Sequence, residues 1–434
     1  MHDSIWTCTA TLPAFPKLTE DKKTDVLIIG GGLCGILCAY YLHKSGVNYM
    51  LVEGNRILSG ITKNTTAKIT AQHGLIYADL VKNAGMEKAK MYAEANEKAI
   101  RQYEKQCQGI DCNFEIKNAY TYSLRDRQKI EAEVKAAEAL GLPASFCDTV
   151  PLPQKIKGAV CFANQAQFHP LKFASSLIKE LNIFEKTFAF AIENKTAITK
   201  NCKIKAQKII VATHFPFINR YGGYFMKLYQ HRSYVSALLN APKIKGMYVD
   251  EAADGLSFRT YENFLLLGGG GHRTGKSGGA WQALDHFAAK HYPDAISKYK
   301  WATQDCMSLD GVPYIGQYGK STENLYVATG FNKWGMTSSM VAANILCDMV
   351  QGRKNEYAPV FSPQRSMIKP QLFVNSIESA ANLLTPKTPR CPHLGCKLSW
   401  NRAEKTWDCP CHGSRFEKDG KLIDNPAMKN MKSN

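Results

Sequence analysis

The stretch VLIIGGGLCG, residues 26–35, decides the fold of this chain. Its four leading apolar residues predict a buried strand, and the glycines that follow predict a tight turn. A helical pattern then runs to about residue 45, and the apolar run Tyr49–Val52 predicts a second strand. Strand, glycine turn, helix and strand in this order form a β-α-β unit, which predicts an α/β fold.

Three of these glycines and one acid have the spacing of a dinucleotide fingerprint. Gly30, Gly32 and Gly35 form the pattern G-x-G-x-x-G, and Glu53 ends the second strand 23 residues after Gly30. The first Gly allows the tight turn, the second lets the backbone approach a pyrophosphate, and the third lets the helix pack on the sheet. The helix N-terminus then faces the phosphates, and the acid binds ribose hydroxyls. The sequence therefore predicts a bound dinucleotide.

The rest of the chain favours FAD over NAD as this cofactor. Around the fingerprint the sequence resembles the glycine oxidase/D-amino-acid oxidase superfamily of FAD enzymes, over about residues 22–355. The resemblance rests on further segments in the family's order, namely Arg56, Thr62–Lys68, Phe168–Pro170, Ala212–Thr213, Asp310–Gly316, Ala328–Phe331 and Gly335–Thr337. It implies a Rossmann-like FAD-binding domain with a β-rich substrate domain. Because no second G-x-G-x-x-G occurs, electrons should come from a substrate bound at the flavin rather than from a separate NAD(P)H domain.

The resemblance also implies which residues surround the flavin. Those expected to bind FAD are Gly30, Gly32, Gly35, Glu53, Arg56, Thr65, Thr66, Ala67, Thr213, Gly330, Gly335 and Thr337. Those expected to be catalytic are Lys68, His73 and Lys333, with Gln72, Arg259, Tyr261, His272, Arg273 and Trp334 as further candidates for substrate contact. The cations could hold a carboxylate or phosphate and stabilise the anionic reduced flavin. Each could instead be a surface cation or a hydrogen-bonded core histidine, and Cys306 is expected to be a buried thiol rather than a flavin attachment point.

A second motif lies near the C-terminus. Cys391 and His393 form C-x-H, and Cys409 and His412 form C-x-x-H after a spacer of 15 residues. A [2Fe–2S] centre with two thiolates on one iron and two imidazoles on the other needs this set from two facing loops. Zinc also accepts two Cys and two His, but zinc fingers pair like ligands in each knuckle, whereas each loop here mixes one Cys with one His. The pattern favours iron and resembles the Rieske family.

This second resemblance implies further details of the metal centre. Cys396 and Cys411 occupy the positions where Rieske proteins of the cytochrome bc type carry a disulfide. Ser414 matches a serine that donates a hydrogen bond to a cluster sulfur, whereas Phe416 replaces the tyrosine that assists it. Hydrogen bonds to cluster sulfurs raise the reduction potential, so we expect a potential below that of bc-type clusters.

A ring-hydroxylating Rieske oxygenase is the alternative for this motif. Asp285, His286 and His291 could mimic part of a mononuclear iron site with two His and one carboxylate. However, the Rieske motif is C-terminal, the acid has the wrong spacing, and a flavin fingerprint takes up the rest of the chain. We therefore expect His286 and His291 on a solvated helix.

Composition limits the partners and the compartment. The 434 residues carry a net charge of +18 and 45% hydrophobic residues, typical of a globular protein with a field that attracts anions. The charges are spread over many segments, so no nucleic-acid partner is expected. The longest uncharged apolar run, residues 26–42, is shorter than a membrane span, and the start of the chain lacks the features of a secretory signal. Together with 14 cysteines, this predicts a cytoplasmic protein without a transmembrane segment.

These observations predict three parts. The flavin oxidoreductase is expected at 22–355, with an FAD-binding part at 22–75, 155–225 and 302–355 and a substrate part at 76–154 and 226–301. A linker at 356–370 and a small all-β Rieske domain at 371–434 follow.

The fusion suggests a function. We expect an FAD-dependent oxidoreductase that oxidises a small, possibly anionic amine, amino acid or hydroxy acid. Its electrons would pass singly through the cluster to an external redox partner. In the alternative, the cluster is the electron inlet and the flavin reduces a bound substrate. A third hypothesis, a nucleic-acid or membrane-surface binder with structural or sensory redox centres, rests on the charge alone.

Overall fold

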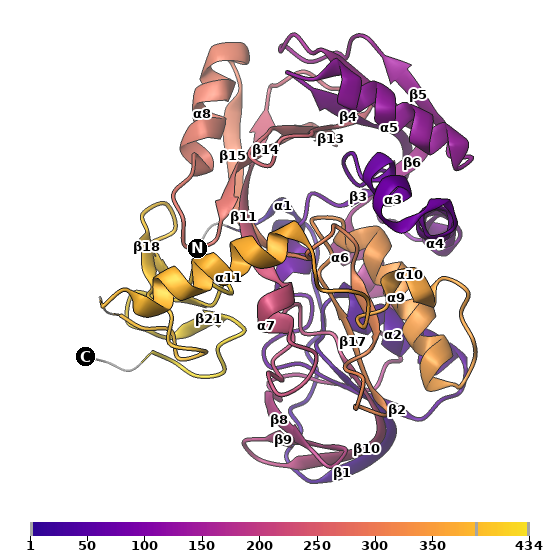
Figure 1. The fold of residues 1–434 in the computed structure, drawn as a ribbon, viewed down its shortest axis with the longest axis vertical. Coiled ribbons are helices and arrows are strands. Elements are labelled where there is room, and N and C mark those ends of the chain that lie inside the picture. Colours follow the sequence, from indigo (N-terminus) through magenta and orange to yellow (C-terminus); the bar gives the residue numbers. More distant parts are fainter. Residues whose placement is uncertain (1–2, 387–388, 432–434) are drawn as a thin grey trace.

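The computed structural model describes residues 3–386 and 389–431. Within this part of the chain three sheets define three units. The first sheet lies at the bottom of Figure 1, the second at the top and the small third one at the left. No helix among the described residues is long and apolar enough to cross a bilayer.

The first sheet is mainly parallel, as the β-α-β pattern predicts, with antiparallel pairs at β16–β17 and in the β8-β9-β10 part. Its order is β16-β17-β10-β1-β2-β7, with the hairpin β8-β9 attached at β10. The strands are β1 (Lys22–Ile29), β2 (Tyr49–Val52), β7 (Ile183–Phe184), β8 (Ala189–Glu193), β9 (Thr196–Thr199), β10 (Lys203–Val211), β16 (Tyr314–Gln317) and β17 (Leu325–Thr329). Leu27 and Ile28 of β1 point to opposite faces, yet both are fully buried, because each face of the sheet has its own hydrophobic core.

Two helices cover one face of this sheet, and short helices lie around it. The covering pair is α2 (Leu33–Lys44) and α9 (Gly335–Val350), which pack against each other. The short helices are α1 (Ile5–Cys8), η1 (Ile61–Asn64), α6 (Pro170–Leu177), α7 (Tyr224–Lys227) and α10 (Ala358–Phe361). Trp6 of α1 is fully buried, and its Nε1 donates a hydrogen bond to the carbonyl of Thr65 at 2.7 Å. The N-terminal segment therefore closes over the loop that follows η1.

The second sheet has nine strands in the order β15-β11-β14-β13-β12-β4-β6-β3, with β5 paired to β6. They are β3 (Lys68–Ile69), β4 (Glu115–Ser123), β5 (Ala144–Cys147), β6 (Gly158–Gln167), β11 (Tyr229–Leu239), β12 (Met247–Asp250), β13 (Ser257–Tyr261), β14 (Phe264–Arg273) and β15 (Ile296–Met307). Its helices are α3 (Tyr77–Ala84), α4 (Met86–Cys107), α5 (Arg127–Ala139) and α8 (Ala280–His291). The antiparallel pair β11 and β15 lies at one edge and faces the other two units, as Figure 1 shows.

The third sheet belongs to the C-terminal unit. Its strands are β18 (Ser399–Asn401), β19 (Thr406–Asp408), β20 (Arg415–Phe416) and β21 (Leu422–Asp424), in antiparallel order. Helix α11 (Pro370–Leu384) leads into it. The loop 391–396 precedes β18 and the loop 409–414 joins β19 to β20, so this small sheet holds both predicted ligand loops together.

The sheets divide the chain differently from the expected parts at several places. Strand β6 falls inside the expected FAD-binding segment 155–225, but it pairs with β4 and β5 in the second sheet. The expected linker 356–370 includes α10 and packs on the first two units, where Phe361 contacts the Tyr92 ring and Arg365 binds Asp310. Its prolines and charges are typical of a linker, but these specific contacts hold it in place. The domain boundaries stay predictions, and residues 387–388 and 432–434 of the expected Rieske part lie outside the described residues.

Candidate functional site

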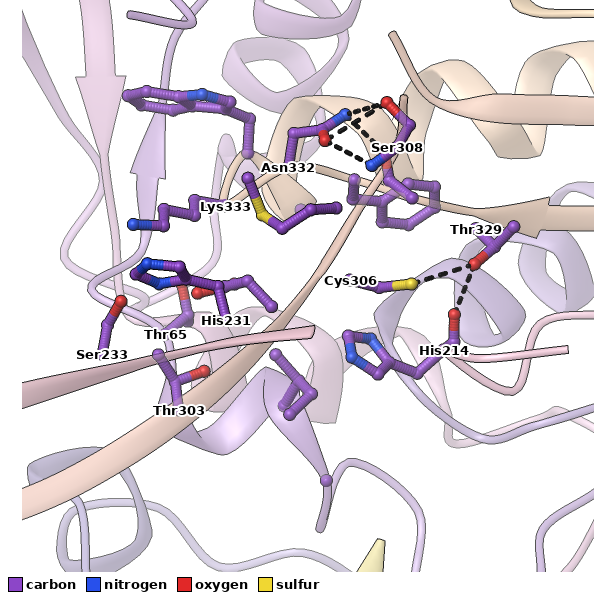
Figure 2. A pocket seen from close by; sticks show the side chains of 18 of the residues that line it. Thr65, His214, His231, Ser233, Thr303, Cys306, Ser308, Thr329, Asn332 and Lys333 are labelled. Carbon is purple, nitrogen blue, oxygen red and sulfur yellow. Dashed lines mark hydrogen bonds between the residues drawn. The ribbon is translucent and has the colours of Figure 1, made fainter. Parts of the chain in front are cut away.

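One large cavity lies where the three units meet. Its volume is about 1880 Å³, well above the roughly 300–1,000 Å³ of ordinary ligand pockets. Its walls include the glycine turn after β1, the end of β2, the turns after β10 and β17, and the inner faces of β11 and β15. Figure 2 shows part of this wall, with His231, Ser233, Thr303 and Lys333 close together. The cavity can hold a dinucleotide together with a small substrate.

The glycine turn fits the phosphates of a dinucleotide. Gly30 has a φ of +114°, and a Cβ there would meet the carbonyl of Ala212. A Cβ on Gly35 would collide with the carbonyl oxygen of Gly30, so the third glycine lets α2 pack closely. At Gly32 the nearest atom to a Cβ would be Thr62 Oγ1 at 3.7 Å, and the backbone borders the cavity. The N-terminus of α2 is therefore free to receive a pyrophosphate.

Glu53, the acid of the fingerprint, also lies where it can bind a ribose. Glu53 accepts hydrogen bonds from the backbone N–H groups of Gly31 at 2.7 Å and Asn55 at 2.8 Å, and it lines the cavity. Burial raises the pKa of Glu53, and these backbone donors act in the opposite direction. A carboxylate fixed in this way beside the glycine turn fits a ribose hydroxyl as its ligand.

Most of the predicted FAD-binding residues line this cavity. Those that do are Gly30, Gly32, Glu53, Arg56, Thr65, Thr66, Thr213, Gly330 and Gly335. Gly35, Ala67 and Thr337 are outside its lining and support it from behind, since Gly35 seats α2 and Ala67 is buried with a φ of +55°. Arg56 forms an ion pair with Glu185 at 3.0 Å, so its guanidinium also anchors the loop after β2.

Two of the predicted catalytic residues are buried in the cavity wall. Burial, together with the nearby positive charge of Arg259, lowers the pKa of Lys68 to about 7, and Lys68 Nζ donates to Thr66 Oγ1 at 3.1 Å. Both ring nitrogens of His73 are engaged, with Tyr92 OH at 2.5 Å and the Thr70 carbonyl at 2.8 Å. Burial lowers the pKa of His73 to about 3. The ring is therefore neutral and held in place, which suits a positioning role better than proton transfer.

Lys333 is more exposed than Lys68 and His73. It lies near His231 and Asp305, which the sequence alone did not indicate. Its side chain is exposed to the cavity, and its Nζ donates to the Ala253 carbonyl at 3.3 Å. Burial raises the pKa of Asp305 to about 6, while Lys333 acts in the opposite direction. His231 faces Asp305 across the β11–β15 pair, and burial lowers the pKa of His231 to about 3. No local motif marks His231 or Asp305, because a long-range strand pairing brings them together.

The remaining candidates for substrate contact have other surroundings. Of the six, Trp334 lines the cavity and stacks on His73. Gln72, Arg259, Tyr261, His272 and Arg273 do not line it. Arg259 is fully buried and donates to the carbonyls of Thr66 and Ala67, both at 2.8 Å. Cys306 is buried, as predicted.

The C-terminal loops bring the four predicted cluster ligands together. Cys391 and Cys409 are buried free thiols that hydrogen-bond each other, and the rings of His393 and His412 lie 4.9 Å apart at an angle of 90°. The Nδ1 atoms of both histidines are buried and have no partner among the described residues. Burial lowers the pKa of His393 to about 4 and that of His412 to about 3, so both rings are neutral and have a free lone pair. Two thiols and two orphaned imidazole nitrogens fit a metal centre of the predicted composition.

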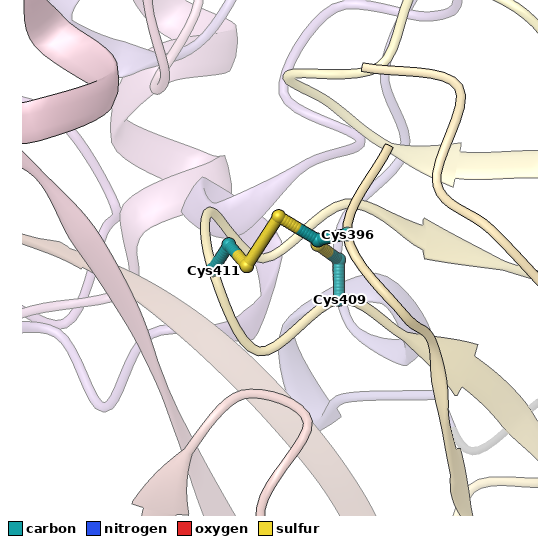
Figure 3. Close-up of side chains that lie close together, drawn as sticks. All are labelled: Cys396, Cys409 and Cys411. Atoms are coloured by element: carbon teal, nitrogen blue, oxygen red, sulfur yellow. A yellow bond between two sulfur atoms is a disulfide. The ribbon is translucent and has the colours of Figure 1, made fainter. Parts of the chain in front are cut away.

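A disulfide flanks this centre. Cys396 and Cys411 are bonded across the two loops, with Cα atoms 6.6 Å apart, as predicted (Figure 3). Within the described residues, Cys396, Cys409 and Cys411 also form a tight group of potential metal ligands. Two of these sulfurs belong to the disulfide and cannot serve as thiolates, so the group itself is no metal site.

Two other residues sit beside the centre as expected. The Ser414 hydroxyl hydrogen-bonds the Cys391 thiol and accepts from the backbone N–H of Ala427 at 3.0 Å. Phe416 is fully buried in the small core of the C-terminal unit. Phe416 has no hydroxyl, so this side chain donates no hydrogen bond to the centre.

We expect Phe416→Tyr to raise the reduction potential of the cluster, because the added hydroxyl would supply a hydrogen bond to the cluster environment. A redox titration followed by the cluster's visible absorbance measures this. The same change at Phe258, which is buried in the second sheet, serves as the control. An unchanged potential in Phe416→Tyr, or a wild-type potential equal to or above that of bc-type clusters, contradicts the expectation.

A chain of hydrogen bonds joins the cavity wall to the ligand loop. His214, which lines the cavity, bonds through Nε2 to Gln230 Oε1 at 3.1 Å, and Gln230 Nε2 donates to the His412 carbonyl at 3.1 Å. Gln304 Nε2 donates to the Gly413 carbonyl at 2.9 Å. The C-terminal unit is thus bonded through its ligand loop directly to β11 and β15.

Comparisons with known proteins agree with this division. The family model for FAD-dependent oxidoreductases, DAO, matches residues 25–349, and the model for the Rieske [2Fe–2S] domain matches residues 382–434. The putative Rieske 2Fe-2S iron-sulfur protein YhfW of Bacillus subtilis is 36% identical, over 99% of this chain and 97% of its own length. The cytochrome b6-f complex iron-sulfur subunit of Nostoc punctiforme is 51% identical over 80 residues, only 18% of this chain and 37% of that subunit.

Solved structures give the same fold. Glycine oxidase from Geobacillus kaustophilus has a TM-score of 0.64 and 19% identity, covering 80% of this chain and all of its own. L-proline dehydrogenase from P. horikoshii has a TM-score of 0.66 and 17% identity, covering 80% of this chain and 98% of its own. At such identities the likeness concerns the fold, and it confirms the predicted α/β fold class.

Proposed function

The chain belongs to the DAO family of FAD-dependent oxidoreductases and carries a C-terminal Rieske domain, so its cofactors are FAD and a [2Fe–2S] cluster. From this premise we propose that it oxidises a small amine, amino acid or hydroxy acid. The electrons then pass through the Rieske domain to an external acceptor. The observation that carries the proposal is the hydrogen-bonded contact between the cavity wall and the loop of His412.

The cavity offers a site for an anionic substrate. Lys333 extends into it from the turn after β17, and no ion pair within the described residues neutralises this ammonium group. It can bind a substrate carboxylate. His231, Ser233 and Thr303 lie opposite and add polar groups that orient the substrate. Lys68 belongs to the same wall, and with a pKa near 7 it can hold or release a proton at neutral pH.

The cofactors supply complementary chemistry, because FAD accepts a hydride from a C–H bond next to nitrogen or oxygen and the cluster carries one electron at a time. The chain's part is to bring the two sites close. His231 and Asp305 pair across β11 and β15, and their side chains face the cavity. Gln230 and Gln304 alternate with them and bind the ligand loop on the other side. The β11–β15 pair therefore contacts the cavity through His231 and Asp305 and the cluster loop through Gln230 and Gln304.

An anaerobic stopped-flow experiment tests the proposal. The holoprotein is mixed under argon with a panel of amines, amino acids and hydroxy acids, while flavin and cluster absorbance are followed separately. We expect at least one substrate class to bleach the flavin, with cluster reduction following. Substrates that carry a carboxylate should be preferred, because Lys333 forms no ion pair with any described residue and can bind the carboxylate.

The competing outcomes are distinct. A flavin that every good substrate reduces while the cluster never follows would rule out the relay. A cluster potential far below that of the flavin would favour the opposite direction, in which the cluster delivers electrons to a flavin that reduces its substrate. If none of the three substrate classes bleaches the flavin, the proposed substrate classes are wrong.

A further inference from the structure

Helix α11 turns its polar side toward the rest of the protein and its apolar side outward. Figure 1 shows it crossing the molecule between α7 and the C-terminal unit. The side that faces the protein is polar: Asn375, its one buried residue, donates to the Met226 carbonyl and accepts from Arg273, and Glu378 forms an ion pair with Lys276 at 2.6 Å. A surface helix of a globular protein normally turns its apolar stripe inward and its polar face to water.

The opposite side of α11 carries an apolar stripe that no other part of the described chain covers. Phe373, Ile377 and Leu384 recur at helical spacing on this side and are 62%, 71% and 83% exposed. Three more apolar side chains in this part of the chain are exposed, namely Ile368 before the helix, Val374 within it, and Leu394 in the first ligand loop. Burial of large apolar side chains stabilises a protein, so three of them exposed in one row indicate an apolar binding partner.

The charges around the stripe indicate which kind of partner covers it. Lys369 precedes the helix, and Arg390 donates to the carbonyls of Leu383 and Thr385 at its C-terminal end, without a carboxylate partner among the described residues. The acid of α11, Glu378, is already neutralised by Lys276. The stripe is thus bounded by cations at both ends, on a chain of net charge +18. A row of apolar side chains between cations matches the acyl boundary and the headgroups of an anionic bilayer.

We propose that α11 lays its outward stripe on the surface of an anionic lipid bilayer and binds the protein peripherally to it. Phe373, Ile377 and Leu384 enter the acyl boundary, while Lys369 and Arg390 meet the headgroups. Leu394 neighbours the ligand His393 in the sequence, so this orientation also brings the first ligand loop toward the lipid. The proposal concerns where the protein binds and does not depend on the direction of electron flow.

Sedimentation of the holoprotein with vesicles tests this. One set contains equal parts of phosphatidylglycerol and phosphatidylcholine, and the other contains phosphatidylcholine alone. We expect clear binding to the first set, weakened by salt, and at least about tenfold weaker binding to the second. The double variant Phe373→Ser/Ile377→Ser should bind the anionic vesicles at least about tenfold more weakly than the wild type, because two inserted side chains are lost.

A matched variant controls for general loss of surface hydrophobicity. Phe190→Ser/Ile296→Ser removes two side chains that are 45% and 55% exposed on β8 and β15, and it should bind like the wild type. Unchanged flavin and cluster absorbance in both variants confirms that they are folded. Lack of vesicle binding by the wild type overturns the proposal. So does a wild-type dimer in light scattering that Phe373→Ser/Ile377→Ser dissociates, because a second copy would then cover the stripe.

Discussion

A Cys409→Ser protein is expected to lose its [2Fe–2S] cluster and to keep its FAD. Cys409 is one of two buried free thiols beside the orphaned Nδ1 atoms of His393 and His412, and a serine hydroxyl is a poor replacement for a thiolate on iron. Substrate should still reduce the flavin under argon, because the cavity does not include Cys409. Transfer to a one-electron acceptor should fall by about a hundredfold or more. Iron analysis, absorbance spectra and acceptor-linked turnover measure these effects.

Cys147→Ser is the matched control for this change, since it removes a free thiol from β5, far from both ligand loops. It should keep iron, flavin and turnover at wild-type values. If Cys409→Ser loses iron but transfers electrons to the acceptor as fast as before, the cluster is not on the route from the substrate. If Cys409→Ser retains a normal cluster, the assignment of Cys409 as a ligand is wrong.

The parts of the site that the sequence predicts are those that short segments build alone. The glycine turn, the helix after it and Glu53 all lie within about 30 residues, and the spacing there corresponds directly to geometry. The two ligand loops are similarly local, so ligand types and a short spacer were enough to predict the metal centre. In both cases each residue's role is determined by neighbours in the sequence.

The rest of the site depends on contacts between distant segments. His231 and Asp305 meet through the register of β11 and β15, which no residue near either of them determines. Gln230 and Gln304 are ordinary polar residues in a strand pattern until the ligand loop packs against them. Helix α11 shows the same limit in another form, since residues 371–434 were expected to be all-β, whereas the structure has this helix there with its apolar side outward.

The contact between the C-terminal unit and β11 depends on a network of buried charges that come from distant segments of the chain. Glu404 accepts from Arg232 of β11 and from Arg415 of β20, the latter at 2.7 Å. Arg415 also binds Asp408 and Asp424, both at 3.1 Å. The side chains of Arg232, Glu404 and Arg415 are at most 11% exposed, so solvent screens them little. Glu404 is therefore the counterion that Arg232 and Arg415 share across the contact.

Glu404→Gln is expected to destabilise the docked C-terminal unit by about 3–5 kcal/mol, because it leaves two buried guanidinium groups with one charge partner fewer. Denaturant unfolding, followed by cluster absorbance and by flavin fluorescence, should show the cluster signal lost first. Glu417→Gln is the control, since Glu417 forms an exposed pair with Lys421 at 3.7 Å, and such pairs are worth about 0.5 kcal/mol. Equal effects of the two changes would contradict the role given to the network.

The same network predicts how the difference in unfolding free energy between the wild type and Glu404→Gln depends on pH. Although burial by itself raises the pKa of Glu404, Arg232 and Arg415 lower it from 4.5 to about 2. A carboxyl whose pKa is lower in the folded state stabilises that state fully above its unfolded value, and this stabilisation is lost as the pH falls through the folded value. The wild type should therefore exceed Glu404→Gln in unfolding free energy by its full margin at pH 6. The margin should shrink between pH 4.5 and pH 2, because a protonated Glu404 and a glutamine are both neutral. A margin that stays constant over this range would show that the charge of Glu404 does not hold the two units together.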